Sequence, residues 1–479
     1  MKFNILGNNF SVLKNFDPIF DIISKVAEDL DQPTFVIGGF VRDVMLERKS
    51  KDIDLVTIGS GIELAKTISK KINSSNVKIF KNFGTAMILF NDLEIQFVGA
   101  RKESYRAESR KPIVENGTLE DDQNRRDFTI NSLAVGLSHE FKGEFIDPFN
   151  GLKHLKEKII KTPLGPDLTF SDDPLRMMRA IRFAAQLNFD IEEKTLQSIE
   201  NNAHRIEIVA QERITEELNK IILSENPSVG FKLMEKTKLL KIIFPEFNLL
   251  KGVEIINGLG HKDNFYHTLE VLENLLPYSK DNLWLRWAAL LHDIAKPKTK
   301  RFSNSTGWTF HGHEDKGSKM VPKIFKRLKL PLDEKMRYVQ KLVFLHLRPI
   351  SLTNKKISDS ALRRLLFEAG EDLEDLMFLC QSDITSKNLY KKQKFLNRFE
   401  EVKKKLKDVE NRDKIKNWQP PVDGKEIMSY FKIKPCKEVG LIKEAIKNAI
   451  LDGDIKNNKQ DALSYMVKKG KELGISNEK

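Results

Sequence analysis

The chain has 479 residues, of which 40% are hydrophobic and 31% are charged, and its formal net charge is +13. Because single hydrophobic cores stop growing at about 250–300 residues, a chain of this length predicts several domains. The basic balance favours a polyanionic partner such as RNA. Only two cysteines are present, which excludes a disulfide framework and predicts a reducing, cytoplasmic location. The chain lacks any run of 18 apolar residues, so we expect no membrane partner.

A glycine pair near the N-terminus has the sequence setting of a phosphate-binding turn. Residues 34–37 predict a buried strand that leads directly into Gly38 and Gly39, and a helix is expected from about residue 41. Glycines at such a turn let the backbone approach a ligand closely. In this geometry, backbone N–H groups at the start of a helix can bind a phosphate.

A carboxylate pair follows about fifteen residues later. Asp52 and Asp54 flank one apolar residue in a second predicted strand, residues 52–58. Because side chains alternate along a strand, both carboxylates lie on the same face of the sheet. Two like charges held this close favour a cation between them. A phosphate-binding turn beside a two-carboxylate metal site predicts nucleotidyl transfer.

The periodicity of the sequence divides the chain into four expected domains. The first 150 residues mix strand and helix patterns, with further strands expected at 77–80, 86–90 and 94–98 and an unstructured polar loop at 101–124. Beyond them the apolar spacing is that of helices. The expected domains are a mixed head at 1–150, a helical neck at 151–250, a histidine-bearing helical domain at 256–392 and a helical tail at 395–479.

The segment after the polar loop carries groups that suit a nucleotide. Arg125 and Arg126 are expected to open a helix, where two adjacent guanidiniums could clamp a triphosphate. Asp127 and Asn131 would share one face of that helix, since they are four residues apart. A surface salt-bridge patch would produce the same pattern, so this segment alone leaves both interpretations open.

A later segment predicts a helix with a polar stripe. Asp172 is a typical N-cap and Pro174 suits a first helical turn. The stripe consists of Asp173, Arg176, Arg179 and Arg182, which recur every third residue. A carboxylate and a guanidinium one turn apart offer an acceptor and a donor that can read a nucleobase edge. An ordinary amphipathic helix with a charged face is the alternative interpretation.

Histidines and carboxylates form another group in the helical domain. His292 and Asp293 end an apolar helix expected at 284–294, where a buried charged pair would be costly without a metal. The other members of this group are His267, His313, His346 and Asp383. Imidazole and carboxylate are ligands of first-row divalent metals, whereas a single buried histidine is more often an ordinary core residue.

The N-terminal segments resemble the class II tRNA nucleotidyltransferases, which are the CCA-adding enzymes, together with the bacterial poly(A) polymerases. The matching segments, in family order, are Gly38-Gly39-x-Val-Arg42-Asp43, Asp52-x-Asp54, Arg125-Arg126-Asp127-Phe-Thr-Ile-Asn131, Asp172-Asp173-x-x-Arg176 and Glu212-Arg213-Ile-x-x-Glu216-Glu217-Leu218. They cover roughly residues 20–240. The resemblance implies an α+β fold, with a small head of the polymerase-β nucleotidyltransferase type (a mixed sheet plus helices), followed by an all-α neck and body.

The resemblance also implies roles for individual residues. Asp52 and Asp54 would be the catalytic acids that hold Mg²⁺, and Asp173 and Arg176 would pair with the incoming CTP or ATP. Taken with the glycine turn and the adjacent guanidiniums, the expected nucleotide-binding set is Gly38, Gly39, Arg42, Arg125, Arg126, Asp173, Arg176, Arg179 and Arg182.

Two positions depart from the family pattern. The strand that often carries a third acid in the family has Gln96 at that place, with Glu94 on the same face, so we expect a two-acid site. The first position of the base-reading segment, often glutamate in the family, is Asp172, which can cap a helix equally well.

The histidine-bearing domain resembles the HD phosphohydrolase superfamily. His267, His292, Asp293 and Asp383 match its four signature positions, and the resemblance implies that they form a second divalent-metal site. His313 and His346 would be available to a further metal in the same region. Whether this domain hydrolyses phosphoesters or only helps to hold RNA stays open.

The function expected from the sequence is addition of C, C and A to the 3′ end of tRNA, from CTP and ATP, with release of pyrophosphate. A poly(A) polymerase, or a partial enzyme that adds only CC or only A, would share this chemistry. An alternative of another class is an HD phosphohydrolase whose head binds RNA without catalysis. The expected partners are tRNA, CTP and ATP, and the sequence does not reveal the oligomeric state.

Overall fold

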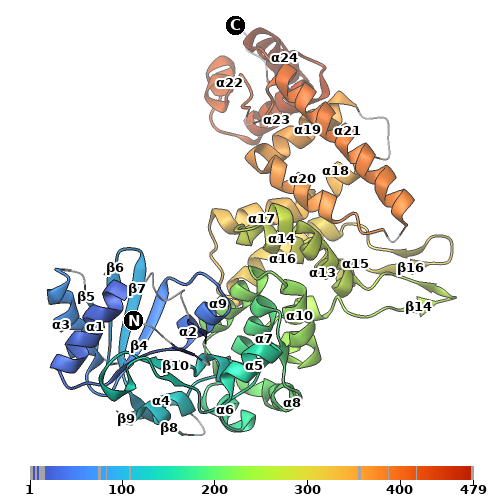
Figure 1. Cartoon of the computed structure of the whole chain (residues 1–479). Helices are drawn as coiled ribbons and strands as arrows, with labels where there is room; N and C mark the ends of the chain where they lie inside the picture. The colour runs from blue at the N-terminus through green and yellow to red at the C-terminus, as the bar shows by residue number, and fades with distance from the viewer. Residues whose placement is uncertain are drawn as a thin grey trace. The chain divides into compact units, whose positions relative to one another are not determined.

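The computed structural model of the chain describes residues 4–5, 8–9, 17–73, 77–81, 84–106, 109–353, 358–386, 388–416 and 418–475. The chain divides into two compact units, Met1–Phe244 and Pro245–Lys479 (Figure 1). Within the described ranges, no helix has both the length and the hydropathy that a bilayer crossing requires.

The first unit begins with a mixed sheet and its flanking helices, as the α+β prediction expects. In chain order these elements are β1 (Asn4–Ile5), β2 (Asn8–Asn9), α1 (Asp17–Asp29), β3 (Thr34–Ile37), α2 (Gly39–Met45), β4 (Asp52–Thr57), α3 (Gly61–Lys71), β5 (Val77–Phe80), β6 (Thr85–Phe90), β7 (Leu93–Gly99), β8 (Arg101–Arg106), β9 (Ser109–Asn116), α4 (Leu119–Asn124), the 3-10 turns η3 (Thr129–Asn131) and η4 (His139–Phe141), β10 (Ala134–Gly136) and β11 (Phe145–Ile146). The predicted strands agree with β3 to β7 within one residue at each end.

Seven of these strands form one sheet in the order β11-β10-β3-β4-β7-β6-β5. Strand β4 lies near the middle, antiparallel to β3 and parallel to β7, while the other neighbouring pairs are antiparallel. Helix α3 packs on β6 and β7 and contacts α1 (Figure 1). One part of the core joins β3, β4 and β10 through Phe35, Ile37, Val56 and Ala134. Ile53 and Leu55, which alternate with Asp52 and Asp54 along β4, are buried on the opposite face of the sheet, and this fixes the face that the two acids occupy.

The prediction that the polar stretch at 101–124 is an unstructured loop is wrong. Strands β8 and β9 pair antiparallel there, with Arg101 opposite Asn116, and α4 follows. Helix α4 begins at a capping box, in which the Thr118 hydroxyl accepts from the Asp121 N–H and the Asp121 carboxylate accepts from the Thr118 N–H. The main-chain pairing and this cap stabilise a segment that has little apolar periodicity.

The predicted helix at the start of the Arg125–Asn131 segment is also wrong. Helix α4 ends before it, at Asn124, and only Thr129–Asn131 forms a short 3-10 turn. The Asp127 carboxylate accepts a hydrogen bond of 2.8 Å from the Phe128 N–H. This local bond to the main chain competes with a helical ladder at this point.

The rest of the first unit is helical, with two short strands that pair parallel to one another. These elements are α5 (Gly151–Glu157), β12 (Ile159–Ile160), α6 (Pro166–Asp172), α7 (Leu175–Leu187), β13 (Asp190–Ile191), α8 (Glu193–Asn202), the 3-10 helix η5 (Ala203–Ile208), α9 (Gln211–Ile222), α10 (Pro227–Lys236) and α11 (Leu239–Ile243). Helix α7 packs against α9 and α10 (Figure 1).

The start of α7 differs from the prediction. Asp172 is the last residue of α6 rather than the N-cap of α7, and Asp173 has an extended backbone with φ −140° and ψ 100°. A residue that precedes proline is disfavoured in the helical region, so Pro174 separates the two helices. Pro174 is the N-cap of α7, and the Asp173 carboxylate, rather than that of Asp172, accepts a hydrogen bond of 3.1 Å from the Leu175 N–H at the start of this helix.

The second unit is mainly helical and carries two short hairpins. Its elements are α12 (Pro245–Asn248), β14 (Ile255–Ile256), β15 (Leu259–Gly260), α13 (Asn264–Leu275), η6 (Leu276–Tyr278), α14 (Leu283–Leu291), α15 (Lys296–Thr299), β16 (Arg301–Ser303), β17 (Gly307–Thr309), α16 (His313–Arg327), α17 (Glu334–Leu345), α18 (Leu347–Leu352), α19 (Asp359–Ala369), η7 (Gly370–Asp372), α20 (Leu373–Ser382), α21 (Leu389–Asp413), α22 (Gly424–Phe431), α23 (Lys437–Asp452) and α24 (Lys459–Glu472). Helices α22 to α24 share a core of their own around Ile427, Ile446 and Met466.

Candidate functional site

The two predicted catalytic acids lie on one face of the central strand β4. In the parallel pairing with β7, Asp52 is opposite Glu94 and Asp54 is opposite Gln96. The place expected for a third acid is therefore beside Asp54 and holds an amide. Asp52 and Glu94 are exposed, whereas Asp54 is half-buried.

Asp54 is held in a setting that favours a bound cation. Burial raises the pKa of Asp54 above its ordinary value of 3.8, the Arg126 guanidinium opposes this effect, and the carboxylate of Asp52 raises the pKa further. Ionisation of both acids is therefore costly in the protein alone. Two carboxylates with accessible oxygens are ligands that suit Mg²⁺, so the donor set fits the metal that the resemblance implies.

Gly38 brings the acids and an arginine close together. Its backbone has φ +86°, and a Cβ atom at this position would lie 2.7 Å from Arg126 Nη1 and 3.7 Å from Asp54 Oδ2. Only glycine leaves this space open without backbone strain. The Gly38 N–H donates to the carbonyl of Leu133 at 3.0 Å, so this amide is already used within the sheet. Helix α2 begins at Gly39, two residues earlier than predicted.

A pocket of about 260 Å³ lies at the base-reading segment. Its lining residues are Arg125, Arg126, Asp127, Asp173, Arg176, Arg179 and Arg213. Arg125 and Arg126 both bind the buried carboxylate of Asp122, the latter at 3.1 Å. Burial would raise the pKa of Asp122, but these two guanidiniums hold it below its ordinary value. Asp122 therefore orients the two cations that the sequence had placed at a triphosphate.

Asp173 and Arg176 are fixed on the wall of this pocket by separate bonds. The Arg176 guanidinium donates to the carbonyl of Arg125 at 2.5 Å and to that of Thr169 at 3.4 Å. Asp173 Oδ2 lies 4.0 Å from Arg213 Nη2. An acceptor and a donor side chain are thus held within one pocket, which is the arrangement needed to read the edge of a base.

Asp127 connects the helix α7 to the 3-10 turn beside it. Its carboxylate accepts from Arg179 Nε at 2.7 Å and from Asn131 Nδ2 at 3.0 Å. Asn131 Oδ1 in turn accepts from Arg42 Nη1 at 2.6 Å. Although burial would raise the pKa of Asp127, Arg179 and Asn131 lower it to about 2. Asp127 and Asn131, predicted to share one face of a helix, are joined by this hydrogen bond although the expected helix is absent.

Three guanidiniums surround the buried ring of Phe183. Their carbon atoms lie 4.2 Å (Arg182), 4.9 Å (Arg42) and 5.5 Å (Arg179) from its centroid. Each of these arginines also has a carboxylate partner, and that of Arg182 is the buried Glu217 at 2.7 Å. Neither Phe183 nor Glu217 has a role that could be assigned from the sequence. The ring immediately follows Arg182, and this adjacency is the only signal that the sequence offers for Phe183.

The structure sorts the nine predicted nucleotide-binding residues into three groups. Those that line the pocket are Arg125, Arg126, Asp173, Arg176 and Arg179. Gly38 lies beside Arg126 and Asp54, and Gly39 starts the helix that carries Arg42. Arg42 and Arg182 lie around Phe183, are largely buried, and are outside the lining of the pocket.

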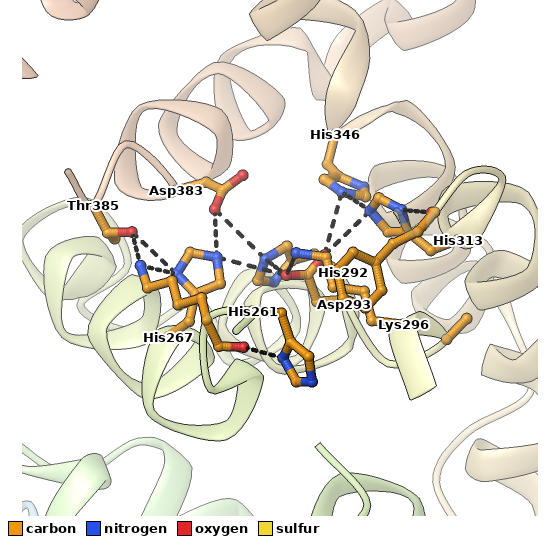
Figure 2. Close-up of polar contacts among 12 residues, drawn as sticks. His261, His267, His292, Asp293, Lys296, His313, His346, Asp383 and Thr385 are labelled. Carbon is orange, nitrogen blue, oxygen red and sulfur yellow. Dashed lines mark hydrogen bonds and ion pairs between the residues drawn. The ribbon is translucent and has the colours of Figure 1, made fainter. Parts of the chain in front are cut away.

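The second unit brings together all six histidine and acid residues that the sequence singled out (Figure 2). Two groups of potential ligands share Asp293: one with His267 and His292, the other with His313 and His346. Asp293 Oδ1 lies 3.2 Å from His313 Nε2, and Asp293 Oδ2 lies 3.2 Å from His292 Nε2. Asp383 completes the cluster through its contact of 2.9 Å with His267 Nε2.

Three of these histidines have a fixed tautomer that suits metal binding. His292, His313 and His346 each place Nδ1 at 2.7 Å from a backbone carbonyl oxygen. A carbonyl only accepts, so Nδ1 carries the hydrogen and Nε2 presents a lone pair. His292 Nε2 is buried without a hydrogen bond, and the Nε2 atoms of His313 and His346 face one another at 3.3 Å. In the neutral rings these Nε2 atoms offer lone pairs beside Asp293, a donor set that fits a divalent cation of the first transition row.

The charges of this cluster are strongly coupled to one another. Burial lowers the pKa of His292, but the carboxylate of Asp293 outweighs it and raises the pKa above the ordinary value. Burial, together with the nearby charge of His292, lowers the pKa of His346 to about 4. Burial would raise the pKa of Asp293, whereas His292 and Lys296 hold it well below its ordinary value. Asp293, at the centre of the cluster, is thus held as a carboxylate. The histidines around it can bind a cation, and Lys296 supplies a positive charge beside it.

Three family models match consecutive parts of the chain. They are the Poly A polymerase head domain at residues 34–161, the Probable RNA and SrmB- binding site of polymerase A at 188–250, and the HD domain at 264–386. The chain belongs to the tRNA nucleotidyltransferase and poly(A) polymerase family. The members of this family are enzymes, and the expected HD-type domain is present in the chain.

Relatives in this family match nearly the whole chain. An A-adding tRNA nucleotidyltransferase of Deinococcus radiodurans is 28% identical, over 90% of the chain and 94% of that protein. A CC-adding tRNA nucleotidyltransferase of Thermus thermophilus is 27% identical, over 90% of the chain and 93% of that protein. An A-adding tRNA nucleotidyltransferase of Aquifex aeolicus is 30% identical over 71% of the chain, which spans only 44% of that longer protein.

Solved structures support the same fold. The crystal structure of a Bacillus stearothermophilus CCA-adding enzyme in complex with CTP has a TM-score of 0.66 and 20% identity, and covers 96% of the chain and 98% of that enzyme's chain. At this level of identity the likeness shows the fold. The likeness therefore supports a fold in which a mixed-sheet head is followed by helical regions.

Proposed function

We propose that the protein is a tRNA nucleotidyltransferase that adds C, C and A to the 3′ end of tRNA, from CTP and ATP, and releases pyrophosphate. The observation that carries the proposal is the pocket in which Asp173 and Arg176 lie among four further arginines, with Arg126 linking it to Asp54. Relatives named A-adding and CC-adding tRNA nucleotidyltransferases, matched over nine-tenths of the chain, support tRNA as the acceptor.

The residues of the head divide the reaction among them. Arg125, Arg126 and Arg179 neutralise the triphosphate and orient it, since phosphoryl chemistry needs mainly positioning and charge compensation. Asp52 and Asp54 would hold Mg²⁺, which would supply a lower pKa for the attacking 3′ hydroxyl and charge compensation for the leaving pyrophosphate.

The base of the incoming nucleotide is selected by side chains rather than by a nucleic-acid template. In the proposal, Asp173 accepts from the exocyclic amino group that cytosine and adenine share, and the Arg176 guanidinium donates to the adjacent ring nitrogen. Uracil and guanine present a carbonyl oxygen at the position of that amino group. They would therefore leave the Asp173 carboxylate facing an acceptor, which disfavours both bases.

A partial activity is the second candidate, because two relatives matched over nine-tenths of their length are named for A addition and for CC addition. A poly(A) polymerase is the third, supported by the model that matches residues 34–161. All three share the proposed site and differ in the acceptor end and the number of additions. The proposed substrates are consistent with the cytoplasmic location expected from the cysteine content.

Purified protein with Mg²⁺, CTP and ATP, given three versions of one tRNA, tests these possibilities. The versions end at the last base before the CCA sequence, after C, and after CC, and the products are read by sequencing. The proposal predicts that all three acquire complete CCA ends. Extension only of the CC-ended tRNA would replace it with A addition, extension that stops at CC would replace it with CC addition, and long A tails on arbitrary RNA would replace it with polyadenylation.

A phosphohydrolase is the candidate of another class, and the metal-binding geometry around Asp293 is the observation that favours it. On this hypothesis the active site lies in the second unit and the head only binds RNA. The acids at 52 and 54 and the arginines of the pocket would then have no chemical task. Nucleotide incorporation by the wild-type protein separates the two classes directly.

A further inference from the structure

Lys262 lies against the one histidine of the metal-binding cluster whose tautomer differs from the others. Its ammonium Nζ is 2.9 Å from His267 Nδ1 and 2.5 Å from the hydroxyl of Thr385. Lys262 also lies 3.8 Å from Glu270 and lines a pocket of about 610 Å³ together with His267, Asp383 and Thr385. The contact is therefore reachable from the pocket and needs no opening of the core.

The chemistry of this contact determines where His267 carries its hydrogen. An ammonium group has three donors and no lone pair, so at 2.9 Å the Nδ1 atom of His267 must be the acceptor. The hydrogen of the neutral ring is then on Nε2, which lies 2.9 Å from Asp383 Oδ1 and donates to it. Both contacts of the ring agree with this single assignment.

The tautomer of His267 is therefore opposite to that of the other three histidines in the cluster. In His292, His313 and His346 a backbone carbonyl holds the hydrogen on Nδ1 and leaves Nε2 as a lone pair. The Nε2 atom of His267 faces the same cluster, 3.5 Å from Asp293 Oδ2, but it carries a hydrogen and cannot bind a cation in this state. Ligating histidines almost always donate their second N–H to an oxygen acceptor, and a lysine supplies no such acceptor.

We propose that Lys262 locks His267 out of the metal-binding set, so that the second unit takes its first divalent cation at Asp293, His313 and His346 and a second one only weakly. The weaker position retains His292, Asp293 and Asp383 as ligands. The lock thus makes the metal affinities of the two positions differ, although the positions share Asp293 and are otherwise similar in their donors. It concerns the second unit alone and is independent of the nucleotidyl transfer proposed for the head.

Thr385 is the partner that His267 would use once the lock is released. Its Oγ1 lies 3.0 Å from His267 Nδ1 and can accept a hydrogen bond from that atom. Replacement of Lys262 by methionine would leave Thr385 as the only neighbour that these contacts place at Nδ1. The ring would then adopt the tautomer of the other three histidines, and Nε2 would join the weaker metal position.

The test is a titration of the full-length, metal-free protein with Mn²⁺, followed by calorimetry and by electron paramagnetic resonance. The protein carries Asp52→Asn and Asp54→Asn, so that the head acids do not contribute. Lys262→Met should strengthen the weaker binding step by about 10–100-fold, the range typical of groups that orient a metal ligand. The first step should stay unchanged, and an exchange-coupled signal of two neighbouring Mn²⁺ ions should appear.

Two control variants separate the lock from a simple effect of charge. Lys262→Arg keeps both the charge and the donor and should titrate like the parent protein. The double variant Lys262→Met/Thr385→Val has the charge of the single variant but lacks the acceptor for Nδ1, and it should lose most of the gain. An unchanged second step in Lys262→Met, or an equal gain in the double variant, would overturn the proposal.

A second measurement reads the tautomers in the wild-type protein itself and uses a variant only to assign a resonance. Nitrogen NMR of the metal-free wild-type protein, with ¹⁵N-labelled histidine rings and a pH at which the rings are neutral, reports each tautomer directly. His267, identified by the resonance that is lost in His267→Gln, should carry its hydrogen on Nε2, whereas His313 and His346 should carry theirs on Nδ1. A hydrogen on Nδ1 of His267 would refute the lock.

Discussion

Replacement of Phe183 by leucine should disturb three arginines at once without removing any charge. The ring lies 4.2, 4.9 and 5.5 Å from the guanidinium carbons of Arg182, Arg42 and Arg179. A cation over an aromatic face contributes about 0.5–2 kcal/mol, and leucine keeps an apolar side chain but has no such face. Even the low end, taken three times, predicts a loss of about 1.5 kcal/mol in the free energy of unfolding.

The same change should weaken nucleotide binding in a characteristic way. Arg179 lines the pocket and holds Asp127, so loss of its support should raise KM for CTP and ATP by about tenfold, which corresponds to about 1.4 kcal/mol. We expect a smaller change in kcat, because Asp52 and Asp54 lie on another element. Steady-state kinetics with each nucleotide, and urea unfolding of the same samples, provide both quantities.

Phe183→Tyr is the matched control, since it restores an aromatic face at the same position. It should recover most of the affinity for CTP and ATP that leucine loses. The reasoning is refuted if folded Phe183→Leu protein has the KM of the wild type, or if tyrosine behaves no better than leucine. A general loss of packing would lower stability in both variants but would not separate KM from kcat in this way.

Three further predictions concern single groups in the head. Burial raises the folded-state pKa of Asp54 above 3.8, so the folded protein loses stability as the pH rises through that folded pKa. Asp54→Asn should therefore raise the Tm of the metal-free protein at neutral pH. The Tm values of the two proteins, measured by thermal scans, should converge below about pH 3.8. Asp127 has a pKa of about 2, so its contribution to stability is present above pH 3.8 and is lost as the pH falls through about 2. Asp127→Asn should lower the free energy of unfolding, measured in urea at neutral pH, by about 3–5 kcal/mol. A variant as stable as the wild type would contradict this prediction. Gly38→Ala should lower activity strongly, because the added Cβ would lie 2.7 Å from Arg126 Nη1 at φ +86°; unaltered kinetics would show that this approach is not needed.

Features of the head that depend on residue spacing could be predicted from the sequence. The alternation of Asp52 and Asp54 around one apolar residue is sufficient to place both on one face, and the sheet register agrees with it. The three-residue repeat likewise places Arg176, Arg179 and Arg182 on α7, whereas Asp173, the first member of the predicted stripe, precedes that helix with an extended backbone. The roles of these residues in catalysis and binding stay predictions until they are tested.

Features that depend on main-chain bonds or on distant partners could not be predicted in this way. Strands β8 and β9 are held by main-chain pairing that leaves little trace in a polar sequence. The change from α6 to α7 depends on the backbone of the residue before Pro174, which overrides the capping preference of Asp172. Lys262 and His267 are only five residues apart in the chain. The tautomer of His267, however, also depends on Thr385 and Asp383, which are more than a hundred residues away in the sequence.

The central claim is that nucleotide transfer occurs at the acids of the head and does not involve the histidine cluster of the second unit. A matched pair of isosteric variants, Asp54→Asn and Asp293→Asn, tests it in one assay of nucleotide incorporation into tRNA that lacks its 3′ CCA. We expect Asp54→Asn to lower the rate by at least about a thousandfold, in line with loss of electrostatic stabilisation at a reacting centre, and Asp293→Asn to incorporate nucleotides at nearly the wild-type rate. Full incorporation by Asp54→Asn, or its loss in folded Asp293→Asn protein, would contradict the account.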